Sequence, residues 1–324
     1  MQLWKVALAA ALAVIASVAP AFAADDYPNR PITLIVPFSA GGPPDSSSRL
    51  IARLLSDKLG QPVVVDNKPG AGSILGMEIG AAAKPDGYTM IFTSSGAMAI
   101  FPWLYKKLTF DPAKSFIAVR AGASNPHMLV FNPSKPYKTL PEFIDYAKKH
   151  PTEINFGSTG SGSPGHLAGE LLQQLTGIKM THVPYRLSTA LQADLLSGVL
   201  DIGIEFPSAM KPHIEMGKIL PVAVASDERM KNFPNVPTFA ELGYPDMKTA
   251  AWGVFLVPSG TPAPIVQKLD AALADALKTP TMINYYSVGD SLVLDIGHDK
   301  FPAFLAAESA RMKALVERSG VTVD

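Results

Sequence analysis

The alternation of short apolar runs with amphipathic stretches is the feature that most restricts how this chain can fold. Continuous apolar runs at 32–36, 63–65 and 89–92 are typical of strands buried on both faces. Between them, the leucines and isoleucine of 50–59 recur at helical spacing, and a second helical stretch ends near residue 83. This strand-helix order predicts the opening of a doubly wound α/β sheet.

The middle and the end of the chain repeat the same pattern. Strands are predicted at 128–131, 155–157, 201–206, 222–225 and 252–257, with another ending at Val183, and helices at 140–149, 166–175 and 188–196 and from Pro264 and Phe301. A chain of 324 residues is long enough for two domains. We predict a first lobe from 24–124 and 226–324 and a second from 125–225, with a hinge where the chain crosses twice, near 121–126 and 223–227.

The first 23 residues have the three parts of a secretory signal peptide. Lys5 lies in a short N-terminal region, an apolar run covers 6–18, and Ala21-Phe22-Ala23 forms an A-x-A cleavage site. The run is short for a membrane span. We therefore predict cleavage of 1–23 and a mature protein in the periplasm of a Gram-negative cell.

Charge and cysteine content exclude several classes of protein. The 28 basic and 28 acidic residues cancel, so no overall field attracts nucleic acid or an anionic membrane. The chain has no cysteine, which excludes disulfides, thiolate catalysis and cysteine-ligated metals. The histidines show neither H-x₃-H nor H-E-x-x-H spacing. We predict no metal and no cofactor.

Three glycine-rich loops, FSAGGPPD, PGAGS and GSTGSGSPGH, follow predicted strands and open predicted helices. Glycine lets main-chain amides approach a ligand, and a helix N-terminus adds unpaired donors and partial positive charge. Gly160, Gly162 and Gly165 also satisfy G-x-G-x-x-G, but 180–186 contains no acidic residue for a ribose. Gly162 is not followed by the lysine of a Walker A loop. The loops therefore predict a site for a small anion such as carboxylate, phosphate or sulfate.

A catalytic interpretation of the third loop is the main alternative. His166 lies close in sequence to Ser158, Ser161 and Ser163, as a base lies near a nucleophile, although the chain has no strict G-x-S-x-G elbow. A histidine that orders the loop or caps the helix fits the same position. We predict no catalytic residue, and keep an α/β hydrolase-like enzyme acting on a small organic acid as the alternative.

Several longer stretches occur together from Tyr27 to the last predicted helix. They include YPNRPITLIVPFSAGGPPDSSSRLIARLLSDKLGQPVVVDNKPGAGS, KPDGYTM, FNPSKPYKTL, FGSTGSGSPGHLAGELL, THVPYR and FPNVPTFAELGYPD. In combination they resemble the substrate-binding proteins of tripartite tricarboxylate transporters, the Bug or TctC-like family. The resemblance implies a two-lobed, type II-like periplasmic binding protein. Each lobe would be a doubly wound sheet with flanking helices, joined by a hinge of two crossing strands, and the protein, expected as a monomer, would deliver a small carboxylate to membrane permease subunits.

The family resemblance also implies which residues hold the ligand. Its first glycine loop and the Ser/Gly loop of its second lobe hold a carboxylate, partly through water. The predicted ligand-binding residues are Phe38, Ser39, Ala40, Gly41, Ser94, Met98, Ser158, Thr159, Gly160, Ser163, His166, Tyr185, Leu187 and Glu205. Asp45 is predicted to cap the first helix, and Arg49 to form an ion pair within the lobe.

Some positions depart from the usual family pattern. Pro44 replaces a threonine, and Met98, Phe101 and Leu187 replace histidine, asparagine and glycine. We therefore predict a ligand with an apolar or aromatic far end, such as a benzoate- or terephthalate-like acid, with packing of these side chains between helices as the alternative. Glu205, where aspartate is usual, is predicted at the cleft floor, where it would repel a second carboxylate. A periplasmic sensor with a signalling partner would share all of these features.

Overall fold

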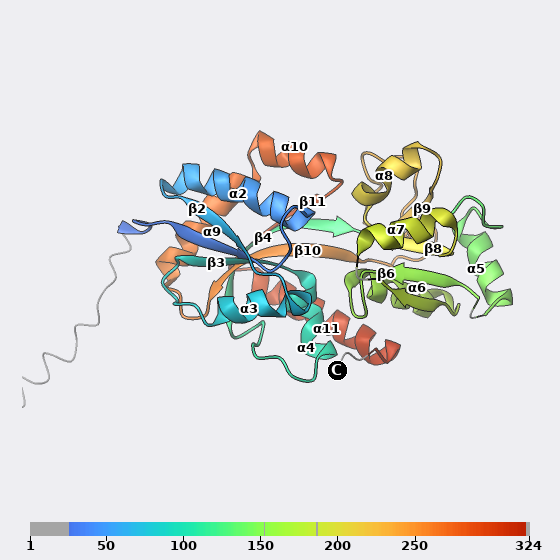
Figure 1. Ribbon diagram of the computed structural model, residues 1–324, viewed down its shortest axis with the longest axis horizontal. Helices are drawn as coiled ribbons and strands as arrows, with labels where there is room; N and C mark the ends of the chain where they lie inside the picture. The colour runs from blue at the N-terminus through green and yellow to red at the C-terminus, as the bar shows by residue number, and fades with distance from the viewer. Residues whose placement is uncertain (1–25, 152, 186, 322–324) are drawn as a thin grey trace, which may run out of the picture.

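The computed structural model describes residues 26–151, 153–185 and 187–321. The predicted signal peptide lies outside these residues. Two mixed sheets with flanking helices lie side by side along the long axis of the molecule (Figure 1). This is the predicted two-lobed α/β architecture. Within the described ranges, no helix combines the length and apolar character needed to cross a bilayer.

The first lobe is built on a six-stranded sheet in the order β11-β4-β10-β3-β1-β2. Its strands are β1 (Ile32–Val36), β2 (Val63–Asn67), β3 (Thr89–Ser94), β4 (Phe116–Pro126), β10 (Ala250–Pro258) and β11 (Leu292–Gly297). The helical elements are α2 (Pro43–Leu59), η2 (Ala71–Ser73), α3 (Ile74–Ala81), η3 (Gly96–Ile100), α4 (Phe101–Leu104), α9 (Ala263–Leu277), α10 (Pro280–Val288) and α11 (Phe301–Ser319). β1 pairs in parallel with β2 and β3, whereas β10 runs antiparallel to β3 and β4.

The second lobe is built on a five-stranded sheet in the order β7-β6-β8-β5-β9. Its strands are β5 (Met128–Phe131), β6 (Asn155–Ser158), β7 (Thr181–Pro184), β8 (Ile202–Glu205) and β9 (Leu220–Val224). The helices are α5 (Leu140–Lys149), α6 (Pro164–Thr176), α7 (Ser188–Ser197) and α8 (Pro207–Glu215). β6 is parallel to β7 and β8, and β5 is antiparallel to β8 and β9.

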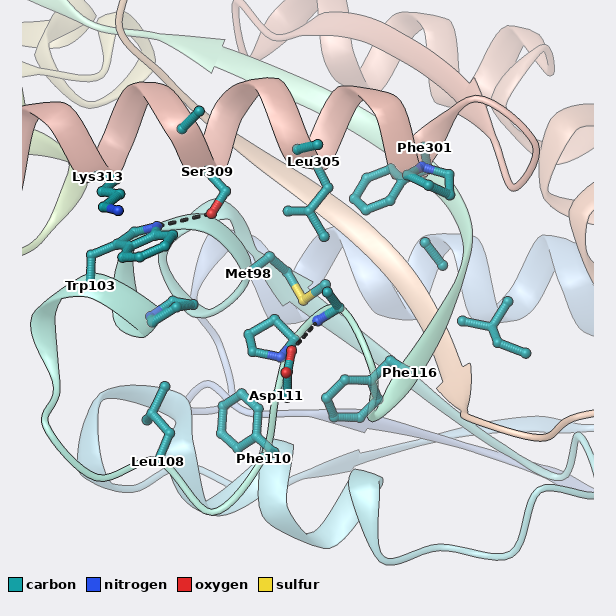
Figure 2. A pocket seen from close by; sticks show the side chains of 18 of the residues that line it. Met98, Trp103, Leu108, Phe110, Asp111, Phe116, Phe301, Leu305, Ser309 and Lys313 are labelled. Atoms are coloured by element: carbon teal, nitrogen blue, oxygen red, sulfur yellow. Dashed lines mark hydrogen bonds between the residues drawn. The ribbon is translucent and has the colours of Figure 1, made fainter.

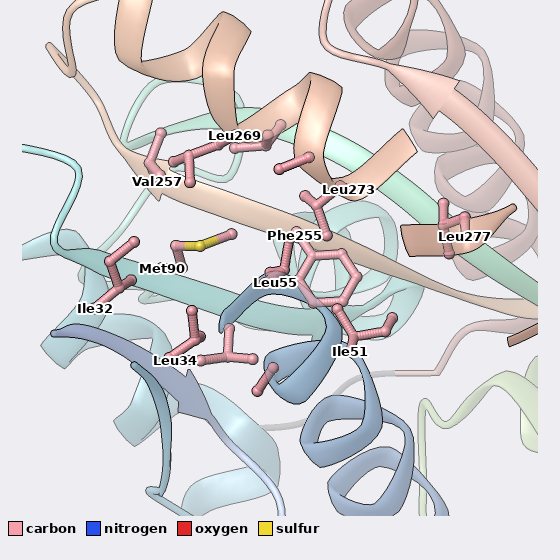
Figure 3. Close-up of a cluster of buried hydrophobic side chains, with 14 of the residues drawn as sticks. Ile32, Leu34, Ile51, Leu55, Met90, Phe255, Val257, Leu269, Leu273 and Leu277 are labelled. Atoms are coloured by element: carbon pink, nitrogen blue, oxygen red, sulfur yellow. The ribbon is translucent and has the colours of Figure 1, made fainter. Parts of the chain in front are cut away.

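Each sheet has its own apolar core. In the first lobe, Leu34 and Met90 from the sheet meet Leu55 of α2 and Leu269 of α9, all fully buried (Figure 3). These are the apolar runs and helical leucines of the sequence pattern. Burial of each such side chain stabilises the fold by about 1.5–3 kcal/mol.

The chain passes between the lobes at two adjacent places. β4 leads directly into β5, and β10 returns the chain to the first sheet, with Ala250 paired to Pro126. His127, between β4 and β5, donates its amide hydrogen to the Thr249 carbonyl at 3.0 Å. The segment 226–249 before this return packs on the second sheet, where Phe239 and Met247 are buried.

Candidate functional site

The two glycine-rich loops with the clearest anion-binding pattern lie at the carboxyl edges of parallel strands. In the first lobe, β1, β2 and β3 end together at Val36, Asn67 and Ser94. In the second lobe, parallel β6 and β8 end together at Ser158 and Glu205. Ligands of open α/β sheets bind at this edge, where the loops leave the strands.

The strand directions make these two edges face each other. β4 is antiparallel to β10, which is antiparallel to β3, so β4 and β3 end at the same edge of the first sheet. The chain enters the second lobe from that edge, and β5 starts there. Since β5 is antiparallel to β8, the carboxyl end of β8 points back toward the first lobe.

The first loop, residues 38–42, is held by a charged network inside its own lobe. The buried Asp45 carboxylate accepts hydrogen bonds from the Gly41 amide (2.9 Å), Arg49 Nε (3.0 Å) and Asn67 Nδ2 (2.9 Å). Asn67 Nδ2 also donates to the Phe38 carbonyl at 3.1 Å. The Arg49 hydrogen bond lowers the pKa of Asp45 to about 2, with the Gly41 amide and Asn67 contributing.

The structure corrects one expectation for this loop and confirms another. Asp45 is not the N-cap: α2 starts at Pro43 with Gly42 as N-cap, and Asp45 reaches back to the loop from the first turn. The prediction that Arg49 pairs within the lobe is confirmed. The Gly41 amide is occupied by Asp45, whereas the amides of Ser39 and Ala40 have no hydrogen-bond partner within the described part of the chain.

The second loop, residues 158–163, is held by serine hydroxyls and a histidine ring. Ser163 is the N-cap of α6, and its hydroxyl accepts from the His166 amide at 3.3 Å. His166 Nδ1 in turn accepts from the Gly162 amide at 2.9 Å. His166 is buried and orders the loop, and its hydrogen bonds leave no base–serine pair with Ser163.

A second histidine, which the sequence analysis did not single out, completes this arrangement. His182 Nε2 lies 2.7 Å from Ser158 Oγ, and its ring stacks on His166 with centroids 3.7 Å apart. Burial and the neighbouring His166 lower the pKa of His182 to about 4. No local sequence pattern predicts this contact, because it depends on the pairing of β7 with β6, which places His182 opposite Phe156.

The second loop keeps several main-chain donors for a ligand. The amides of Thr159, Ser161 and Gly165 have no hydrogen-bond partner among the residues that the structure describes. Thr159 and Ser161 are exposed. Gly160 and Gly162 have φ of 125° and 75°, a conformation that favours glycine.

The second loop also touches the first lobe. A Cβ atom on Gly162 would lie 1.9 Å from Leu104 Cδ2 of α4. Leu167 of α6 is buried in the same apolar cluster as Leu104 and Leu315 of α11. The lobes are therefore in direct contact behind the second loop.

The remaining predicted residues lie in different surroundings. Glu205 is 7% exposed at the end of β8, and burial raises its pKa to about 7. The Tyr185 hydroxyl donates to Asp194 at 2.6 Å and is held within its lobe, and Leu187 is 66% exposed before α7. Ser94 is half-buried at the carboxyl edge of β3.

Met98 lies away from the two loops. It is 2% exposed in η3 and contributes to the wall of a cavity between α4, β4 and α11 (Figure 2). Phe101, one turn further, packs edge-on against Tyr105 at 5.1 Å. These positions match the alternative that the apolar side chains pack between helices.

The donor set favours an organic or inorganic anion over a metal. No cluster of three or more histidine, aspartate or glutamate side chains able to hold a metal is present in the described ranges. The exposed groups of both loops are amides and hydroxyls. Amides at a helix start bind carboxylate through charge-assisted hydrogen bonds.

Comparison with known proteins gives a consistent result. The profile of the tripartite tricarboxylate transporter family receptor matches residues 48–321. Protein BugT of Bordetella pertussis is 35% identical over 306 residues, covering 94% of each chain. A protein of R. palustris solved with adipate is 34% identical, with a TM-score of 0.81 and coverage of 92% of this chain and 99% of that one. MatC from Rhodopseudomonas palustris with bound malate is 31% identical, with a TM-score of 0.77 and coverage of 90% and 100%.

Proposed function

The chain belongs to the Bug or TctC-like family of tripartite tricarboxylate transporter receptors, and we propose that it captures one small organic carboxylate between its lobes. The family consists of periplasmic solute-binding receptors and not of enzymes. This family assignment therefore takes the place of the interpretation as a hydrolase-like enzyme. The proposal concerns the ligand, the residues that hold it and the partner that receives it.

The observation that carries the proposal is the pair of loops at opposed carboxyl edges, each with unused main-chain amides. Ser39 and Ala40 offer donors from the first lobe, and Thr159, Ser161 and Gly165 offer them from the second. Hydrogen bonds to a charged group are worth about 1.5–3 kcal/mol each. Three or four of them, less the cost of closing the lobes, give an affinity of about −8 kcal/mol, which is micromolar.

The proposed closure uses the two crossings as a hinge. His127 and Thr249 are hydrogen-bonded to each other where the strands leave the first sheet. Because 226–249 packs on the second sheet, we place the return crossing near Thr249, later than the sequence-derived lobe boundary at 225. A ligand shifts the protein toward closure only if it contacts both lobes better in the closed form.

The nature of the far end of the ligand is a finer proposal. The exposed Leu187 supports an apolar or aromatic body, as in benzoate or terephthalate. Met98 does not add to this support, because it is buried in the first lobe. With a pKa near 7, Glu205 is partly protonated at neutral pH and can donate one hydrogen bond to a ligand, whereas its charged form repels a second carboxylate.

We further propose that the closed, monomeric receptor delivers its ligand to permease subunits from the periplasm, after cleavage of residues 1–23. A sensor that presents the closed form to a signalling partner is the second candidate. Both uses share the same loops, so the ligand site does not distinguish them. The two are separated by co-purifying the closed protein with membrane proteins of the same cell and identifying whether a permease subunit or a signalling protein is captured.

The grip by main-chain amides is tested with a matched pair of variants. Gly165 is the second residue of α6, where its amide has no acceptor within the helix. The second residue of α2 is Pro44, so a helix of this protein already begins with proline at that position. Gly165→Pro removes the amide hydrogen, whereas Gly165→Ala keeps it. The ligand is first chosen by thermal shift and calorimetry from malate, adipate, citrate, benzoate and terephthalate.

We expect Gly165→Ala to bind as the parent does, and Gly165→Pro to bind at least about tenfold more weakly, since one charge-assisted hydrogen bond is lost. Equal affinities of the two variants contradict the amide grip. Chemical conversion of the ligand contradicts the receptor function. Stabilisation by citrate alone contradicts the apolar far end.

A further inference from the structure

The first lobe contains a second concave site, and no residue of the two glycine-rich loops lines it. Its volume is about 820 Å³, within the range of pockets that hold small organic molecules. Its walls come from α4 and the segment after it, from the start of β4, and from α11 (Figure 2). These elements are far apart in the sequence, so the site exists only in the folded lobe.

The inner wall of this cavity is apolar and rigid. Met98, Phe116 and Phe301 are each no more than 6% exposed and belong to one apolar cluster. Phe110 packs edge-on against Phe116 with ring centroids 6.0 Å apart. Such a wall suits an aliphatic or aromatic body, because it offers hydrophobic contact and ring edges at fixed positions.

The rim of the cavity is polar and includes the cationic side chain of Lys313. Trp103 Nε1 donates to Ser309 Oγ at 2.9 Å, and Lys313 Nζ lies 4.8 Å from the centre of the Trp103 ring (Figure 2). Lys106 also lines the site. Lys313 has one carboxylate neighbour, Glu317 at 3.8 Å, and both side chains of this pair are largely exposed.

The other charged groups of the rim are already held in the fold. Asp111 accepts from the Ala113 amide at 2.9 Å and pairs with Lys114 at 3.1 Å. His298 Nδ1 lies 3.0 Å from Asp270. Lys313 is therefore the charged group of the rim that we assign to an incoming acid.

We propose that this cavity is a second binding site, and that it takes an amphiphilic organic acid with its apolar or aromatic body against the inner wall and its single acid group beside Lys313. This chemistry differs from that of the interlobe loops, which offer amides and hydroxyls. The second site is confined to one lobe and does not depend on closure. It stands independently of the interlobe function.

The probe for the test is 4-phenylbutyrate, with 4-phenylbutyramide as its uncharged analogue. Binding is followed by calorimetry and by tryptophan fluorescence of the mature chain. Trp103 lies on the rim, the chain's other tryptophans being Trp252 in β10 and Trp4 in the predicted signal peptide. We expect saturable binding of the acid with a Kd below about 1 mM and a change in fluorescence, and weaker binding of the amide.

Two neighbouring alanines on α11 allow one variant that blocks the cavity and a matched control. Ala306 is exposed and lines the cavity, whereas its neighbour Ala307 is also exposed but does not line it. We expect Ala306→Phe to weaken binding of the acid at least about tenfold, and Ala307→Phe to leave it unchanged. Lys313→Gln is expected to remove most of the preference for the acid over the amide.

Three results overturn the proposal: no saturable binding at millimolar 4-phenylbutyrate, equal binding to the Ala306→Phe and Ala307→Phe proteins, or equal affinity of the parent for acid and amide. Displacement of the probe by the interlobe ligand also overturns it, since the acid would then occupy the other site. Thermal unfolding of each variant shows that it is folded before it is compared.

Discussion

The ligand loops of the two lobes have the same outline but are held by different chemistry. Both leave a buried parallel strand and open a helix with proline at its start. The first loop is anchored by the charged network around Asp45. The second is anchored by the rings of His166 and His182 with the hydroxyls of Ser158 and Ser163. Similar loops therefore respond differently to pH and to mutation.

The loops also differ in what surrounds them. The second loop touches the opposite lobe through Gly162 and Leu104, whereas a Cβ on Gly41 would meet no atom within 4 Å. The second helix start keeps one more amide than the first, because Gly165 stands where α2 has Pro44. We infer that the second loop carries more of the lobe-to-lobe contact, and that the first is a preformed anchor.

The largest expected effect comes from filling the contact at Gly162. Gly162→Ala places a methyl group against Leu104 and forces alanine to a φ of 75°. Left-handed backbone costs about 1–2 kcal/mol and overpacking about 1–3 kcal/mol. We expect a loss of about 4 kcal/mol in the free energy of unfolding, measured by urea denaturation.

Gly41→Ala is the control for this experiment, since its φ of 84° imposes similar strain in open space. It should cost only the backbone term, about 1–2 kcal/mol. In a Leu104→Ala background, Gly162→Ala should cost less than it does in the parent, because the clash with the Leu104 side chain is then absent. Equal losses for the two glycine variants would show that the lobes do not press on the second loop.

The second effect in size comes from removing the carboxylate that anchors the first loop. Asp45→Ala leaves the Gly41 amide and two side-chain donors without their acceptor. We expect a loss of about 3 kcal/mol, because a charged acceptor of several hydrogen bonds is removed. Arg49→Ala should cost less than about 1 kcal/mol, since Arg49 is half exposed and water replaces it. If both variants lose the same amount, the ion pair and not the amide anchor holds the loop.

The smallest expected effect is a difference in pH response. His182 has a pKa of about 4 in the folded protein against 6.5 for a free side chain, so the unfolded chain binds the extra proton between these values. Stability is therefore lost as the pH falls from about 6.5 to 4. For Asp45, whose pKa is lowered from 3.8 to about 2, stability is complete above 3.8 and is lost only as the pH falls further.

Acid should consequently weaken the second loop before the first. We expect His182→Gln to reduce the loss between pH 6.5 and 4.5 by about 1–2 kcal/mol, the full linkage value being lowered by the partial exposure of the ring. Asp45→Asn should leave the slope in this window unchanged. Buried His127, with its pKa lowered to about 4 by desolvation, contributes the same slope in all these proteins. If the free energy of unfolding of His182→Gln falls with pH as steeply as that of the parent, then His182 does not make the second loop more sensitive to acid than the first.

Much of the fold and part of the candidate site follow from local patterns. The strand at 32–36 and the helices from Phe301 and around 140–149 are where the apolar periodicity predicts them. His182 was missed as an anchor because its contact with Ser158 depends on the register of β6 against β7. The family pattern places Met98 in the cleft, where histidine is usual, but η3 turns it into the apolar cluster of the first lobe.

The sequence by itself determined the alternation of strands and helices, the glycine positions and the lack of a bulk charge, because these depend on residue type and short spacing. The tertiary structure alone decided that the two loops face each other, which amides stay unpaired and which side chains form the cavity between α4 and α11. Each of these depends on strand direction and on contacts between residues far apart in the chain. Local propensity does not encode such long-range geometry.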